Sequence, residues 1–144
     1  MRKLSSLAVL FVLAGLLCTG SAAFAFDKNH LMKFGAKKSC RECDLSGVNL
    51  SGANLSNANL ANANLKNADL RKANLQKANL QEANLVQTDL RNADLRYADL
   101  RNAQLFRTNL RGANLTGANI EGTKMIGAKF CKTKMPWGID NDDC

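Results

Sequence analysis

Residues 53–80 read ANLSNANLANANLKNADLRKANLQKANL, a run in which leucine returns at every fifth position. Leucine keeps this register from Leu45 to Leu115, fifteen times without a gap. Ile120, Met125, Phe130 and Met135 continue it. A small residue stands two places before each of these positions, and Asn or Asp usually stands between the two. The unit of this 144-residue chain is therefore a quintet.

A period of five fits neither regular secondary structure. On an α-helix, five residues turn the chain by about 500°, so successive leucines would lie about 140° apart and form no apolar face. On a straight strand, an odd period would send alternate leucines to opposite sides. The pattern becomes consistent if the chain turns a corner in every quintet, because the small residue and the leucine then both point inward on every side. If four corners close a coil, residues twenty apart stack at about 4.8 Å, and residues 43–135 form a rod roughly 22 Å long.

The runs Ala53-Asn54-Leu55, Ala68-Asp69-Leu70 and Ala98-Asp99-Leu100, each followed by two variable residues, resemble the pentapeptide-repeat family. The resemblance covers about two thirds of the chain. It implies an all-β fold, the right-handed quadrilateral β-helix of that family. The hand and the four sides come from this resemblance and not from the periodicity.

The first 25 residues have the three parts of a signal peptide. Arg2 and Lys3 form a basic start, an apolar run follows over residues 7–18, and Ala23-Phe24-Ala25 is typical of a cleavage site. The apolar run is shorter than the roughly 20 residues that a membrane span needs, so we expect no span after cleavage; an uncleaved membrane anchor is the alternative. Removal leaves 18 basic and 12 acidic residues, a net charge of +6. The predicted location is the periplasm, with the thylakoid lumen and the extracellular space as alternatives.

The two ends of the solenoid need covers, since a bare end exposes leucine and an unpaired edge. We expect a cap over residues 26–42, with a short helix from Asp27 to Gly35, ahead of the solenoid at residues 43–135. A tail at residues 136–144 closes the other end, and we expect Trp137 to cover the last coil.

Four cysteines remain in the exported chain, and export favours disulfides. Cys131 lies 88 residues beyond Cys43, which is about 21 Å along the rod, whereas a disulfide needs Cα atoms within about 7 Å. The predicted pairs are therefore Cys40 with Cys43 and Cys131 with Cys144. A redox role for Cys40 and Cys43 and a zinc site are the weaker alternatives, because the chain offers no βαβ context and no second close pair.

Stacking by twenty sorts the outward residues into ladders. Arg71, Arg91 and Arg111 form one ladder, and Arg96 and Arg101 add positive charge to this candidate binding surface. The functional interpretation is a strip that binds a polyanion: an anionic lipid, an envelope polymer, an acidic protein or a nucleic acid. The structural interpretation is a solvated surface in which neighbouring aspartates neutralise the arginines, and the sequence favours it slightly.

A second ladder contains Val86, Phe106 and Ile126, which are apolar at a position expected to face water. It is a candidate interface, with self-association as the first expectation and coverage by the tail as the alternative. Thr88 and Thr108 stack inside one wall and are expected to hydrogen-bond locally.

The function that these patterns favour is that of a non-catalytic structural or binding scaffold, with a protein partner or a homodimer and no cofactor or metal. An enzyme is disfavoured because the only histidine, His30, stands in the cap and no base accompanies a nucleophile. Some relatives are acidic mimics of DNA that bind gyrase, but this chain is basic and carries an export signal. Direct nucleic-acid binding is disfavoured by the export signal and by the lack of an aromatic stacking platform.

Overall fold

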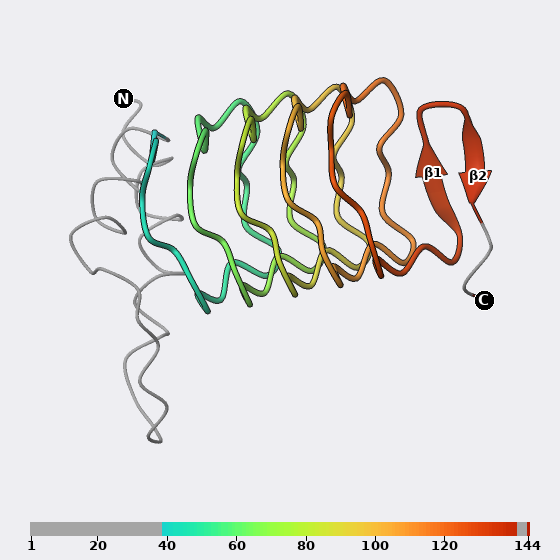
Figure 1. The fold of residues 1–144 in the computed structure, drawn as a ribbon, viewed down its shortest axis with the longest axis horizontal. Coiled ribbons are helices and arrows are strands. Elements are labelled where there is room, and N and C mark those ends of the chain that lie inside the picture. The colour runs from blue at the N-terminus through green and yellow to red at the C-terminus, as the bar shows by residue number, and fades with distance from the viewer. Residues whose placement is uncertain (1–38, 141–143) are drawn as a thin grey trace, which may run out of the picture.

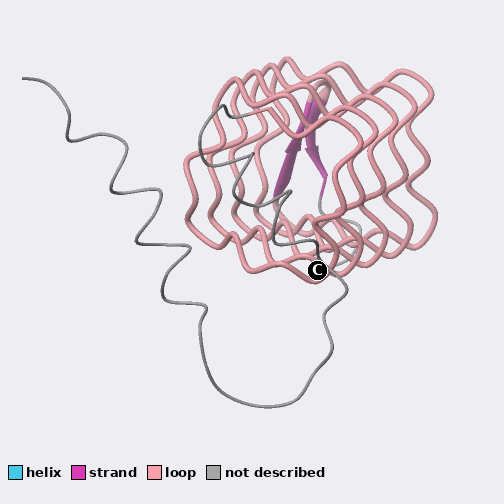
Figure 2. Ribbon diagram, turned by 90° about the vertical axis from the view of Figure 1, so that its left-hand side faces the viewer, coloured by secondary structure: helices cyan, strands magenta, loops and turns pink. Residues whose placement is uncertain are grey.

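The computed structural model describes residues 39–140 and 144, and over this range the chain winds into a rod of stacked coils (Figure 1). Every isolated bridge joins two residues twenty apart in parallel register, from Ser39 with Asn59 to Asn114 with Lys134. Viewed from the end, the coils superimpose into a four-sided outline (Figure 2). Four quintets therefore close one coil of a β-helix.

Backbone hydrogen bonds join each coil to the next. The Leu50 amide donates to the Asp69 carbonyl at 2.7 Å, and the Asp69 amide donates back to the Val48 carbonyl at 2.9 Å. The same two bonds recur with the period of the sequence along the rod. Neighbouring coils therefore satisfy each other's backbone groups along the walls of the rod.

Each corner is a tight turn whose second central residue has a positive φ. The Ala53 amide donates to the Leu50 carbonyl at 3.0 Å, and φ at Gly52 is +69°. This geometry explains why Gly or Asn follows nine of the fifteen leucines by two places, because these residues tolerate the left-handed region best. The Asn or Asp before the leucine caps the same corner: Oδ1 of Asn54 accepts the Ser56 amide at 3.2 Å.

We name the four sides of the rod by their central residues. The members of wall 1 are 45, 65, 85, 105 and 125; of wall 2, 50, 70, 90, 110 and 130; of wall 3, 55, 75, 95, 115 and 135; and of wall 4, 40, 60, 80, 100 and 120. The leucines from Leu45 to Leu115 are buried, and the alanines between them let the opposite walls approach. Among the described residues, no buried side-chain nitrogen or oxygen lacks a hydrogen-bond partner.

Thr88 and Thr108 occupy inward positions that alanine fills elsewhere. Their hydroxyls donate to the carbonyls of Leu65 and Leu85 at 2.7 Å, each 23 residues earlier in the chain. The expectation of local bonds was wrong, because each hydroxyl bonds to a carbonyl of the previous coil and not to one in the threonine's own quintet. These hydroxyls tie neighbouring coils together.

The C-terminal end closes with a hairpin. Strand β1 (Thr133–Met135) belongs to wall 3, and β2 (Gly138–Asp140) pairs with it in antiparallel fashion beyond the last coil (Figure 1). The turn between them places Trp137 outside, with 71% of its surface exposed, so the expectation that Trp137 covers the last coil was wrong. Pro136 ends the five-residue register, and the chain then runs back antiparallel to β1 on wall 3. The indole ring of Trp137, in the turn, stays exposed.

The N-terminal end of the ladder begins at Ser39, which bridges Asn59, so residues 39–42 already form part of the first coil. The expected signal peptide and the helix from Asp27 to Gly35 lie outside the described residues. Within residues 39–140, no helix is long and apolar enough to cross a bilayer.

Candidate binding surface

Outward side chains give the four walls different chemistry, and the most ordered feature is a set of arginine–aspartate pairs. Arg71 donates to Asp69 through Nε at 2.9 Å and Nη2 at 2.6 Å. Arg96 repeats this with Asp94, at 2.9 and 2.7 Å. The same two-pronged contact joins Arg91 to Asp89 and Arg101 to Asp99. Each guanidinium therefore already uses its fork on a carboxylate two residues earlier.

Three aspartates of these pairs, Asp69, Asp94 and Asp99, have a lowered pKa that favours the ionised form. Hydrogen bonds from the Arg96 guanidinium lower the pKa of Asp94, against an opposing effect of partial burial, and Gln76 of the previous coil adds a bond at 2.9 Å. Arg71 lowers the pKa of Asp69 in the same way. Hydrogen bonds to Asp94 raise the pKa of Arg96 in turn. The pairs thus behave as neutral units on the surface at neutral pH.

The five arginines predicted to form one binding surface lie on three walls. Arg71, Arg91 and Arg111 stack on wall 2, whereas Arg96 lies on wall 3 and Arg101 on wall 4. The four paired guanidinium side chains remain 43–46% exposed. This geometry fits a salt-bridged, solvated surface better than a strip of free positive charge.

The apolar ladder lies on wall 1. Val86 and Phe106 are half-buried, and Ile126 is 78% exposed. The hairpin of β1 and β2 lies on wall 3 and leaves Ile126 uncovered. The ladder is thus an accessible stripe on the outside of the rod.

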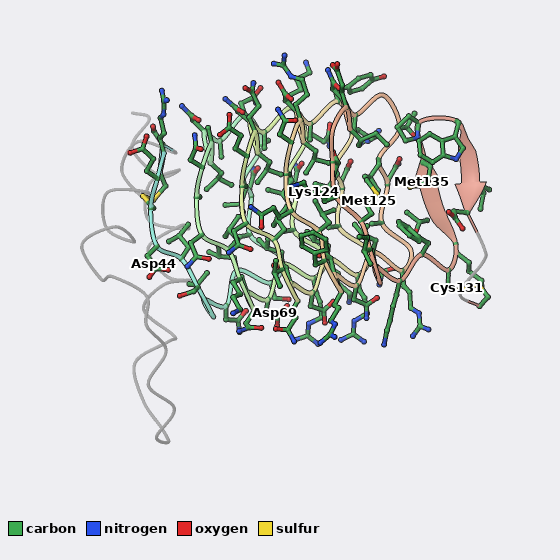
Figure 3. The ribbon with its side chains drawn as sticks, in the orientation of Figure 1. Asp44, Asp69, Lys124, Met125, Cys131 and Met135 are labelled. Atoms are coloured by element: carbon green, nitrogen blue, oxygen red, sulfur yellow. A yellow bond between two sulfur atoms is a disulfide. The ribbon has the colours of Figure 1, made fainter. Side chains whose placement is uncertain are left out.

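Three cations lie on wall 1 in or beside the apolar ladder. Lys66 stands below Val86 in the same column, Lys124 stands beside the stripe on one side, and Arg107 stands on the other. Figure 3 labels Lys124 and, four coils earlier on the same wall, Asp44. Stacking by twenty at all three outward positions of the quintet, and not only at the position after leucine, is the signal that places Lys124 and Arg107 beside the ladder.

The cysteines form two disulfides, Cys40–Cys43 and Cys131–Cys144, which are the pairs that the register predicts. Cys40 and Cys43 are buried at inward positions on either side of one corner of the first coil, whereas Cys131 is half-buried and Cys144 exposed. In the described part of the chain, no cluster of three His, Cys, Asp or Glu residues could hold a metal ion.

Comparison with known proteins identifies the repeat. The family model of pentapeptide repeats matches eight copies in this chain, over residues 39–76, 73–112 and 102–130. Comparison with curated proteins finds no match.

Two solved structures illustrate the relationship. HetL, a pentapeptide repeat protein involved in heterocyst differentiation regulation in the cyanobacterium Nostoc, is 33% identical, with a TM-score of 0.59 over 69% of this chain and 50% of its own. This chain therefore spans half the length of HetL. A pentapeptide repeat protein of the Arabidopsis thaliana thylakoid lumen is 31% identical, with a TM-score of 0.65 over 67% of this chain and 68% of its own.

The plasmid-mediated fluoroquinolone resistance protein QnrB1 is 22% identical, with a TM-score of 0.22, over 64% of this chain and 62% of its own. This similarity adds no argument about what the present chain binds. The matched repeats span well over half of the sequence, and the stacking by twenty follows from them. The chain belongs to the pentapeptide repeat family, whose members fold as right-handed β-helices.

Proposed function

We propose that the chain is an exported, non-catalytic binding protein that acts through contacts between its outer surface and a partner protein. The observation that carries this proposal is that the leucine and alanine of each quintet fill the interior. The remaining positions give the four walls chemically different outer surfaces. A packed interior offers no concave site for a small substrate. Rigid outer walls instead offer fixed positions for recognition.

Export is supported by the three-part leader over residues 1–25 and by the two disulfides, which persist in oxidising compartments. The thylakoid-lumen relative is compatible with such a compartment. The periplasm of a Gram-negative bacterium is our first choice for the location, and the lumen is the second.

A polyanion-binding strip of arginines is the weaker candidate function. Arg71, Arg91, Arg96 and Arg101 hold aspartates through two hydrogen bonds each, and a phosphate or sulfate would have to displace those carboxylates. A mimic of DNA that binds gyrase is weaker still, since the formal net charge of the chain is +8.

The test uses photo-crosslinking from four consecutive, exposed corner positions, one at the end of each wall. The full chain is expressed in a Gram-negative host with benzoylphenylalanine in place of Gln87, Lys72, Lys77 or Glu82. We expect a periplasmic product that starts at Phe26, and crosslinks to a protein from at least one wall. An unprocessed product in the cytosol would refute export, and the absence of any crosslink from all four walls would refute the binding role.

A further inference from the structure

Wall 1 differs from the other three walls in that no arginine–aspartate pair forms on it in the described part of the chain. Walls 2, 3 and 4 each carry at least one arginine–aspartate pair. Wall 1 carries Lys66, Arg107 and Lys124, and its one acidic residue in the described range is Asp44 on the first coil. None of these three cations forms a salt bridge with a described residue. From the second coil onward, the charged side chains of wall 1 are all basic.

The same wall holds the apolar stripe, and the cations bracket it. Val86, Phe106 and Ile126 occupy one column on three successive coils, about 4.8 Å apart. Lys124 belongs to the neighbouring column on one side and Arg107 to the column on the other. The stem of Arg107 lies against the next coil, since a Cβ added to Gly127 would lie 3.5 Å from its Cγ. The aliphatic stem thus extends the apolar stripe and carries its charge to the rim.

We infer that wall 1 is the docking surface for an acidic amphipathic helix of a partner protein, laid along the axis of the rod. This inference rests on the proposed function and names the wall and the chemistry of the partner. An α-helix advances 5.4 Å per turn, close to the spacing of the stripe, so apolar residues on one helical face would contact Val86, Phe106 and Ile126 in succession. Alternate residues of an extended strand lie more than 6 Å apart and would lose this match.

Charge distinguishes this partner from the two other molecules that could cover the apolar stripe, a second copy of the chain and an anionic membrane. A second copy would place Arg107 and Lys124 near the same cations of its partner, with no acidic residue on either stripe to compensate. An anionic membrane is usually recognised by clusters of about four to eight basic residues, and wall 1 has three. Acidic side chains on both flanks of a helix would meet Lys124 on one side and Arg107 on the other.

The test is a fluorescence anisotropy titration of the full chain with a synthetic peptide helix. The peptide carries leucine at helical spacing and glutamate on the flanks; one control has the same composition in scrambled order, and another has lysine in place of glutamate. We expect the acidic amphipathic peptide to bind and both control peptides to bind at least tenfold more weakly. Failure of the acidic peptide to bind, or equal binding of its scrambled form, would overturn the inference.

Variants assign the binding to wall 1. Phe106→Asp and Arg107→Glu should each weaken binding at least tenfold. Lys77→Glu is the matched control: it makes the same charge change on wall 3, at a corner residue with φ of 57°, against 56° at Arg107. Equal loss in Lys77→Glu would show that net charge alone drives binding and would overturn the assignment. Far-ultraviolet circular dichroism and thermal melting confirm that each variant is folded.

Two further measurements address the other occupants. Phosphatidylglycerol vesicles that bind the wild-type chain, but not Phe106→Asp, while the peptide does not bind, would make wall 1 a membrane surface instead. A dimer in sedimentation velocity that Phe106→Asp dissociates would make the partner a second copy. Crosslinks from walls 2, 3 or 4 with none from wall 1 would refute this inference and leave the proposed function standing.

Discussion

At the scale of the residue, the positive φ of the second corner residue determines how much a substitution there lowers the stability of the fold. Gly52 and Gly117 share a φ of +69°, but a Cβ on Gly52 meets open space, whereas a Cβ on Gly117 would lie 2.6 Å from the Tyr97 ring. We expect Gly52→Ala to lower the free energy of unfolding by about 1 kcal/mol through backbone strain alone. Gly117→Ala should cost more, because the ring must also move.

A double-mutant cycle separates the two causes. In a Tyr97→Ala background, the cost of Gly117→Ala should fall to that of Gly52→Ala, as measured by urea denaturation. An excess that persists without the ring would show that the corner at Gly117 is strained for another reason.

The pair of Asp94 with Arg96 makes the stability of the fold depend on pH in the acid range. Arg96 holds the pKa of Asp94 below the ordinary value of 3.8, so the pair stabilises the fold above that pH, and this contribution is lost as pH falls through the lower, folded value. Asp94→Asn keeps the acceptor for the Arg96 amide and removes the charge. We expect the variant to be less stable than wild type at pH 7 and equally stable at the acid end of a urea-denaturation series.

The control is Asn79→Asp, which adds a carboxylate where Gln81, and not arginine, stands two residues later. This variant should gain no comparable stability as pH rises. A stability difference for Asp94→Asn that stays constant down to the lowest pH would contradict the role assigned to the Arg96 pair.

At the scale of the element, the two disulfides differ in access. Cys40 and Cys43 are buried in the first coil, while the Cys131–Cys144 bond reaches the surface beside the hairpin of β1 and β2. Thiol–disulfide exchange requires a direct approach to sulfur. Under native conditions with dithiothreitol, we expect Cys131–Cys144 to be reduced first and Cys40–Cys43 only on unfolding. Differential alkylation followed by mass spectrometry measures both, and simultaneous reduction would mean that the first coil opens easily.

The elements also show how far the sequence could be interpreted. Every inner quintet makes the same contacts, so a single argument about period, corner and stacking predicts the coil and the cysteine pairs. The hairpin has no repeated counterpart. A turn at Pro136 and Trp137 folds β2 back on wall 3, and the periodicity of the repeats does not predict the position of such a strand. The neutralisation of arginines by nearby aspartates could be predicted, because each aspartate stands two residues before its arginine, whereas the grouping of the five arginines into one surface was wrong, because Arg96 lies on wall 3 and Arg101 on wall 4.

At the scale of the whole molecule, the rod has unequal ends. The side chains of Ile120, Met125 and Phe130 are half-buried in the last coil, whereas Leu100, Leu105 and Leu110 one coil earlier are fully buried. Lys124 and Lys129 also stand where Asn or Asp caps the earlier corners, and lysine has no oxygen to accept the turn amide.

Stability in a stacked repeat depends on nearest neighbours, so the last coil should open most easily. We expect hydrogen exchange, followed by mass spectrometry, to be fastest over residues 116–132 and slowest over residues 60–100. Uniform protection along the rod would show that it opens only as a single cooperative unit.

The twenty-residue coil also means that the wall on which an outward residue lies depends on the number of quintets that precede it. Inserting one extra ANLSN unit into the middle of the rod would preserve every inward contact yet index all later quintets by a quarter turn, so that the stripe of Phe106 would continue the column of Arg71 instead of Lys66. Inserting four such units would lengthen the rod by one coil and restore the original alignment. Duplication of quintets can therefore reassign a recognition face without touching a single residue of the core.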